Sequence, residues 1–163
     1  MTDRPALTFN GPLEAGVRAV AVLGSAYPAS FDIQRLTALD YLLVRTSVLD
    51  GPDDLHPSAP IQTPATEVRR KVVQDAVHMM MTRDLIERHV YDDGITYRAG
   101  EAAAVFLNSL TTPYISALKD RARWLTERLS DFDNDAFDDM MRNFFDQWMV
   151  EFQDSETRPD STP

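Results

Sequence analysis

The spacing of apolar residues along the first half of the chain predicts three helices. In each, apolar positions recur three or four residues apart, which places them on one face of a helix. The first begins at Pro12, because proline suits a first helical turn, and Pro28 ends it. The second follows the N-cap Asp32 and covers Ile33–Leu49, and the third covers Thr66–Arg83.

A long loop, residues 50–65, separates the second and third helices and is rich in Pro and Asp. Loops of this length are unusual in a compact domain and are commonly functional. In a DNA-reading helix-turn-helix the corresponding turn has only about 3–4 residues. The loop therefore favours a scaffold that does not present a groove-reading helix.

The segment Leu85–Arg98 predicts a β-hairpin directly after the third helix. Ile86 and Val90 alternate with polar residues, as do Ile95 and Tyr97. Between the two runs, Asp93-Gly94 is a tight-turn signal, because glycine can adopt the positive φ that such turns need. Three helices followed by a hairpin is the element order of a winged helix.

The rest of the chain is predicted to be helical. One helix is headed by Ala102 and Phe106, the next follows the cap Thr112, and the acidic run 130–135 precedes the last. The predicted fold class is mostly α, a winged-helix-like domain followed by C-terminal helices. The predicted parts are an extended lead-in (1–11), the winged-helix-like domain (12–100), a C-terminal helical region (101–153) and a disordered tail (154–163).

Charge and composition narrow the possible partners. The formal net charge of the 163-residue chain is −10, so its mean field repels DNA phosphates and anionic lipids, and DNA binding would need a local basic patch. No apolar stretch approaches the roughly 18 residues needed to cross a bilayer, and the first residues do not resemble a signal peptide. There are no cysteines. We therefore expect a cytoplasmic protein without membrane contact.

No catalytic motif stands out in the sequence. The three histidines lack the spacing that places two metal ligands on one helical face. We find neither a glycine-rich phosphate loop nor a nucleophile elbow. The sequence thus predicts a protein that is not an enzyme and that carries no metal or cofactor.

Two groups of residues are candidate binding surfaces. The first is a basic face, for which the alternative is a solvated surface paired with nearby acids or a protein-binding surface. Its members are Arg69, Arg70, Lys71, Arg88 and Arg98. The second is the apolar face of the last helix, which either completes the core or forms an oligomer or partner interface. Its members are Phe137, Met141, Phe144, Trp148 and Phe152.

Several segments, in order, resemble the middle component of bacterial ABC-three-component systems, which are related to the Lamassu class of anti-phage defence. They are Phe9–Ala19, Asp40–Val44, Leu55–Pro60, Gly94–Glu101 and Arg121–Leu125. The resemblance implies an adaptor that joins an SMC- or Rad50-like ATPase to an effector and contacts DNA only within that complex. The alternative is a dimeric winged-helix transcription regulator, and a homodimer is compatible with either function.

Overall fold

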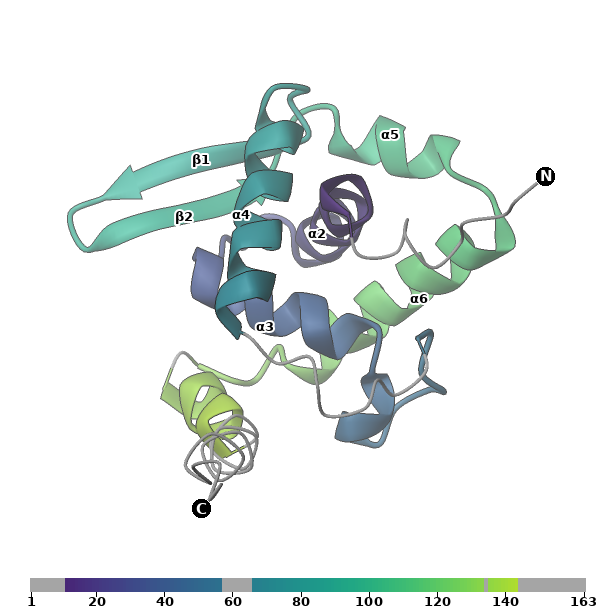
Figure 1. Ribbon diagram of the computed structural model, residues 1–163, viewed down its shortest axis with the longest axis vertical. Helices are drawn as coiled ribbons and strands as arrows, with labels where there is room; N and C mark the ends of the chain where they lie inside the picture. The colour runs from purple at the N-terminus through teal and green to yellow at the C-terminus, as the bar shows by residue number, and fades with distance from the viewer. Residues whose placement is uncertain (1–10, 57–65, 134, 144–163) are drawn as a thin grey trace, which may run out of the picture.

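The computed structural model describes residues 11–56, 66–133 and 135–143 (Figure 1). Its helices are α2 (Pro12–Ala26), α3 (Ile33–Leu43), the 3₁₀ helix η1 (Thr46–Leu49), α4 (Thr66–Met81), α5 (Ala103–Ser109) and α6 (Pro113–Arg128). Its strands are β1 (Ile86–Tyr91) and β2 (Gly94–Ala99), and residues 135–143 are also helical. The fold is therefore mostly helical with one antiparallel hairpin, as the sequence predicts.

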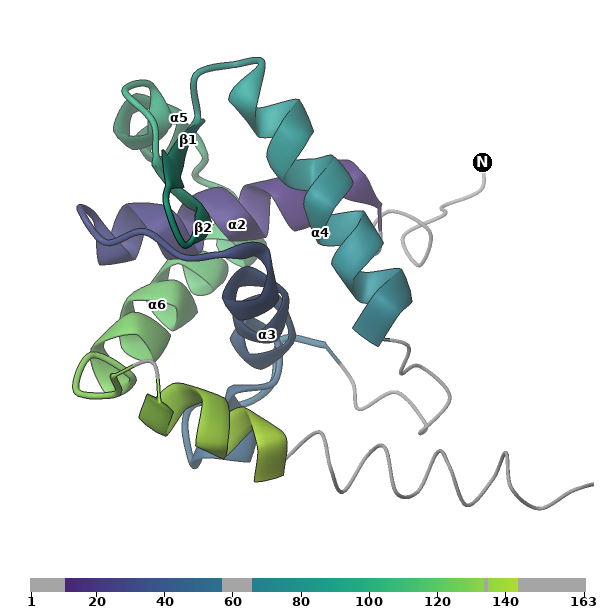
Figure 2. The same cartoon turned by 90° about the vertical axis from the view of Figure 1, so that its left-hand side faces the viewer.

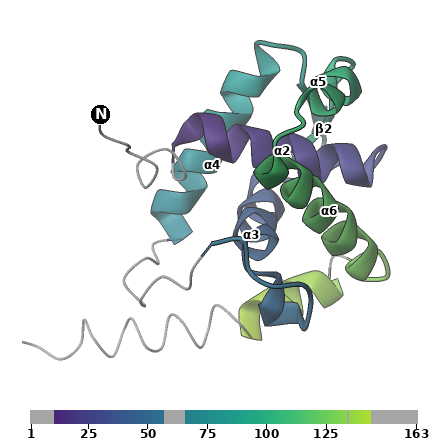
Figure 3. The same cartoon turned by 90° about the vertical axis from the view of Figure 1, so that its right-hand side faces the viewer.

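Helix α2 is the centre of the fold, and α4 and α6 pack on opposite sides of it (Figures 2 and 3). Small residues let the neighbours approach closely. A Cβ at Gly16 would collide with Met80 of α4, and a Cβ at Gly24 would lie 2.8 Å from Leu107 of α5. Close packing on several sides explains why most of α2 is buried.

The buried apolar residues form two clusters, and α2 contributes to both. One joins α2 to α4 and to the base of the hairpin. The other joins α2 to α3, α6 and the segment 135–143. The predicted boundary between 12–100 and 101–153 stays a prediction, as do the lead-in and the tail, whose residues 1–10 and 154–163 lie outside the described part of the chain.

Local capping signals in the sequence are confirmed. Asp32 accepts a hydrogen bond from the Arg35 backbone N–H at 2.7 Å, and Thr112 accepts one from Ile115 at 3.3 Å. The side chain of Asp133, in the acidic run, accepts one from the Ala136 N–H at 2.7 Å. Each bond satisfies a backbone donor that the start of a helix leaves unpaired.

The prediction of one continuous helix over Ile33–Leu49 is wrong, because the α-helix ends at Leu43. The carbonyl of Val44 accepts hydrogen bonds from the N–H groups of Leu55 and His56, at 3.1 and 3.3 Å. The chain then turns into η1, where the hydroxyl of buried Thr46 donates to the Pro52 carbonyl at 2.6 Å. Contacts with a later segment, and not the local pattern, end the helix.

Two smaller differences concern the third helix and the hairpin turn. Helix α4 ends at Met81 rather than Arg83, and the chain reverses at Asp84, whose φ is 58°. Gly94 has the expected positive φ, 149°, but it already pairs with Tyr91 at the start of β2. The two-residue turn is therefore Asp92-Asp93 and not Asp93-Gly94.

The hairpin is buried at its base and exposed towards its tip, and Figure 1 shows it projecting from the helical body. At the base, Tyr97 exchanges backbone hydrogen bonds of 2.8 and 2.9 Å with Phe31, in the connection between α2 and α3. Towards the tip, Val90 and Ile95 face each other across the strands and are 68% and 43% exposed.

Within the described ranges, the search for membrane spans found no helix with the length and apolar character to cross a bilayer.

Candidate functional site

The predicted basic face falls into two separate groups. Arg69, Arg70 and Lys71 lie near the start of α4, whereas Arg88 and Arg98 lie in the hairpin that follows its other end. A helix rises about 1.5 Å per residue, so most of the length of α4 separates the two groups along its axis.

Arg69 and Arg98 already face carboxylates. Arg69 Nη1 lies 2.8 Å from Asp40 Oδ2, and Arg98 Nη2 lies 2.9 Å from Glu87 Oε2. The hydrogen bond from Arg98, and a second one from His89, lower the pKa of the Glu87 carboxyl below its ordinary value. Exposed cations remain at Arg70, Lys71 and Arg88. The basic face stays a prediction.

Two of the five apolar residues predicted to form an interface on the last helix lie in the described range. Phe137 and Met141 are 2% and 6% exposed and pack into the cluster shared with α3 and α6. The guanidinium carbon of Arg35 lies 4.2 Å from the centre of the Phe137 ring. These two residues help to complete the core, which is the first of the two alternatives that the sequence offers for this helix. Phe144, Trp148 and Phe152 lie outside the described residues.

Sequence reasoning missed a buried charge cluster, formed by Arg18, Asp40 and Arg69. Arg18 Nε lies 2.6 Å from Asp40 Oδ1, and both side chains are 5% exposed. Because Arg69 binds the other oxygen, one carboxylate joins α2, α3 and α4. The available signal was Asp40 itself, a charged residue among the apolar positions of its helix, since such residues are rarely buried without a partner.

The end of the described loop lies beside this cluster. His56 Nε2 and the Tyr114 hydroxyl of α6 are 2.8 Å apart. Burial lowers the pKa of His56, and the positive charge of nearby Arg18 lowers it further. Burial also raises the pKa of Tyr114. The pair thus connects the loop to α6 through groups that are neutral at pH 7.

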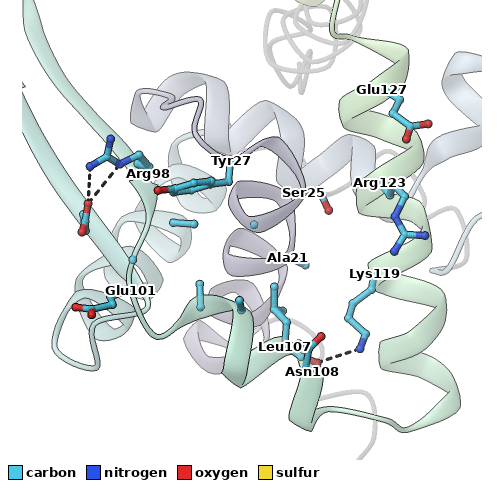
Figure 4. A pocket seen from close by; sticks show the side chains of 16 residues that line it. Ala21, Ser25, Tyr27, Arg98, Glu101, Leu107, Asn108, Lys119, Arg123 and Glu127 are labelled. Carbon is cyan, nitrogen blue, oxygen red and sulfur yellow. Dashed lines mark hydrogen bonds and ion pairs between the residues drawn. The ribbon is translucent and has the colours of Figure 1, made fainter.

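A second feature that sequence reasoning missed is a groove of about 920 Å³, bounded by α2, the hairpin base, α5 and α6 (Figure 4). Several of the residues that line it are small, among them Gly24, Ser25 and Ala104. The wall on α6 carries Lys119 and Arg123, which lie one turn apart. Lys119 reaches towards the end of α5, and the Arg123 guanidinium lies along α6 on the side of Lys119. No local pattern could predict the groove, because its walls come from four elements.

A third feature is the apolar overhang, by which we mean Val90 and Ile95 on the hairpin. Side chains alternate between the two sides of a strand. Val90 and Ile95 therefore lie on the same side as the buried residues Ile86 and Tyr97, while Glu87 lies on the other side. The overhang thus extends the core side of the hairpin beyond the helical body.

A search for groups of acidic, histidine or cysteine residues that could hold a metal ion found none within the described residues. The features that stand out are a buried cluster that fixes helices, a groove with charged walls and an exposed apolar overhang. Fold and features together define a mostly helical protein with a winged-helix-like hairpin.

A family model described as ABC-three component (ABC-3C) system Middle Component 2 matches residues 8–151. The match spans most of the 163-residue chain, and the protein therefore belongs to this family. The comparison with curated proteins and the comparison with solved structures found no match.

Proposed function

We propose that this protein is the non-catalytic adaptor of an ABC-three-component complex and couples an SMC- or Rad50-like ATPase to an effector in anti-phage defence. The observation that carries the proposal is the family match over residues 8–151, since a middle component belongs to a system of several components. A relation to Lamassu systems, a cytoplasmic location and action without a cofactor belong to the same proposal.

The surface of the molecule supports this role. Val90 and Ile95 project from the body as an exposed apolar pair, which offers a partner an apolar contact near the hairpin tip. The groove lies on the other side of the same hairpin, where Glu87 and Arg98 line it. An adaptor needs at least two surfaces, one for each of its neighbours.

The alternative, a dimeric winged-helix regulator, has weaker support. Of the five predicted basic residues, Arg69 and Arg98 already face carboxylates. The net charge of −10 opposes the approach of DNA. Binding of a DNA duplex at low salt by the isolated chain, with an affinity that falls steeply as salt rises, would favour this alternative.

Co-expression tests the adaptor function. The tagged chain is produced with the ATPase and the effector encoded beside it, and the complex is isolated by affinity and size-exclusion chromatography. We expect both proteins to co-purify with the chain. Absence of both from the eluate, with a folded chain, would refute the proposal.

A pair of variants tests whether the overhang takes part. The combined change Val90→Asp and Ile95→Asp should remove at least one neighbour from the complex. Val68→Asp is the matched control, because Val68 is 65% exposed on α4, away from the hairpin. Equal recovery of both neighbours with the overhang variant would show that the adaptor binds them through other surfaces.

A further inference from the structure

We propose that the groove is the docking site for a carboxylate-bearing segment of a partner protein, recognised by Arg123 and Lys119 of α6. This inference rests on the proposed adaptor function and deepens it, because it assigns a surface and a partner chemistry.

The two cations lie one turn apart on α6 and both line the groove. Lys119 Nζ donates to the carbonyls of Leu107 and Leu110, each at 2.9 Å, which fixes the ammonium at the lower end of the groove. An ammonium has three N–H groups, and these two carbonyls use two of them. Figure 4 shows the Arg123 guanidinium on the side of Lys119, turned away from Glu127.

Arg123 is only loosely held within its own helix. Its side chain is 68% exposed, and its Nη1 lies 3.8 Å from a carboxylate oxygen of Asp120. An exposed pair of this kind contributes little free energy. Arg123 can therefore exchange Asp120 for a carboxylate of a ligand at small cost, and a guanidinium can bind such a group with two parallel hydrogen bonds.

Lys119 and Arg123 place two positive charges one turn apart on the α6 wall, where they attract an acidic ligand group. On the hairpin wall the two opposite charges already pair with each other. Glu101 and Glu127 also line the groove and repel the same group elsewhere along it. The cations and acids that line the groove therefore favour a carboxylate beside Lys119 and Arg123 and disfavour one elsewhere in the groove.

The small residues that line the groove suit the close approach of a polypeptide. Ser25 and Ala104 are small and exposed, so the backbone of a docked segment can lie near α2 and α5. A pocket for a small molecule is enclosed mostly by apolar groups. Here charged side chains stand on both walls, as they do at the rim of a protein interface. These features favour a protein segment over a small metabolite.

The test measures the affinity of the full-length chain for the purified ATPase and for the effector, by biolayer interferometry. Arg123→Glu should weaken binding of one of them at least tenfold, and Arg123→Gln should weaken it less. Ala104→Trp, which fills the groove, should weaken the same interaction. Circular dichroism melting curves check that every variant is folded.

Matched controls isolate the groove from general effects. Arg128→Glu changes charge by the same amount on α6, and Val105→Trp adds the same ring on α5 at a residue that is 75% exposed; neither residue lines the groove. Both controls should stay within twofold of the unmodified chain. If Arg128→Glu weakens binding as much as Arg123→Glu does, the loss of affinity is a general effect of charge and not of the groove, and the inference is overturned.

The two proposals fail in different ways. If the unmodified chain binds a partner and both groove variants bind it equally well, the groove assignment is wrong and the adaptor function stands. If the unmodified chain binds neither the ATPase nor the effector, both proposals are overturned.

Discussion

Replacement of Asp40 by asparagine is the most informative single change for the stability of this fold. The substitution keeps the shape of the side chain but removes the charge that lies between Arg18 and Arg69, at 2.6 and 2.8 Å. Arg18 would then lose this carboxylate at a site where its side chain is only 5% exposed. The change tests whether the charge cluster holds α2, α3 and α4 together.

The expected magnitude follows from burial. Removing one partner of a buried ion pair costs about 3–5 kcal/mol, because the remaining charge stays out of water. Arg69 adds less, since its side chain is 27% exposed and can turn towards solvent. A domain has about 5–15 kcal/mol of stability in total. We therefore expect Asp40→Asn to remove about 3–5 kcal/mol, which is at least a fifth of the unfolding free energy.

Urea unfolding followed by far-ultraviolet circular dichroism measures this loss. Asp75→Asn is the matched control, because Asp75 is an exposed aspartate on α4. A double variant, Arg18→Met with Asp40→Leu, should recover much of the lost stability, because no charge then remains buried between α2 and α3. If Asp40→Asn costs less than about 1 kcal/mol, as a surface substitution does, the reasoning from burial is refuted.

Three further predictions concern other parts of the fold. Gly51→Ala should destabilise the protein by about 1–3 kcal/mol, because the added methyl overlaps the ring of Trp124, and a changed tryptophan emission spectrum together with a lower urea midpoint would record it. Asp32→Ala should cost about 0.5–2 kcal/mol through loss of the α3 cap, and thermal melting checks it against Asp53→Ala at an exposed loop aspartate. Because the pKa of His56 is lowered in the folded protein, the imidazole binds a proton more readily in the unfolded chain as pH falls. The free energy of unfolding is therefore highest at pH values above 6.5, the ordinary histidine pKa, and declines as pH drops through that value. His56→Gln should flatten this decline in urea titrations between pH 7 and 5, and an unchanged slope would contradict the assignment.

The helix starts and the hairpin could be predicted because their causes are local. Asp32 and Thr112 cap helices with bonds to residues three positions away, and alternation alone marks β1 and β2. The end of α3 could not be predicted in this way. The end of α3 depends on hydrogen bonds from the backbone N–H groups of Leu55 and His56 to the Val44 carbonyl. The sequence after Leu43 carries no helix-breaking residue until Gly51, so the local pattern does not show where the helix ends.

The candidate site was less accessible to sequence reasoning, because its geometry depends on pairs that are distant in the chain. The sequence predicts that the adjacent residues Arg69, Arg70 and Lys71 share one basic face, yet Arg69 faces Asp40, which lies 29 positions earlier. The sequence alone does not show which of these cations forms an ion pair within the fold. Lys119 likewise donates its hydrogen bonds to carbonyls at the end of α5. Arg123, one turn further along α6, is loosely held.

The position of the hairpin constrains how an adaptor of this shape could transmit binding. Glu87 and Arg98 line the groove, while Val90 and Ile95 lie on the other side of the same two strands. The hairpin is attached through the bonds between Phe31 and Tyr97, which fix its base to the connection between α2 and α3. Ile86 and Tyr97 at this base are buried in the core, so a partner on the overhang could change the groove wall only by shifting the packing of the core at the base. By linkage, any such effect is reciprocal, so that the occupant of the groove and the occupant of the overhang change each other's affinity by the same factor.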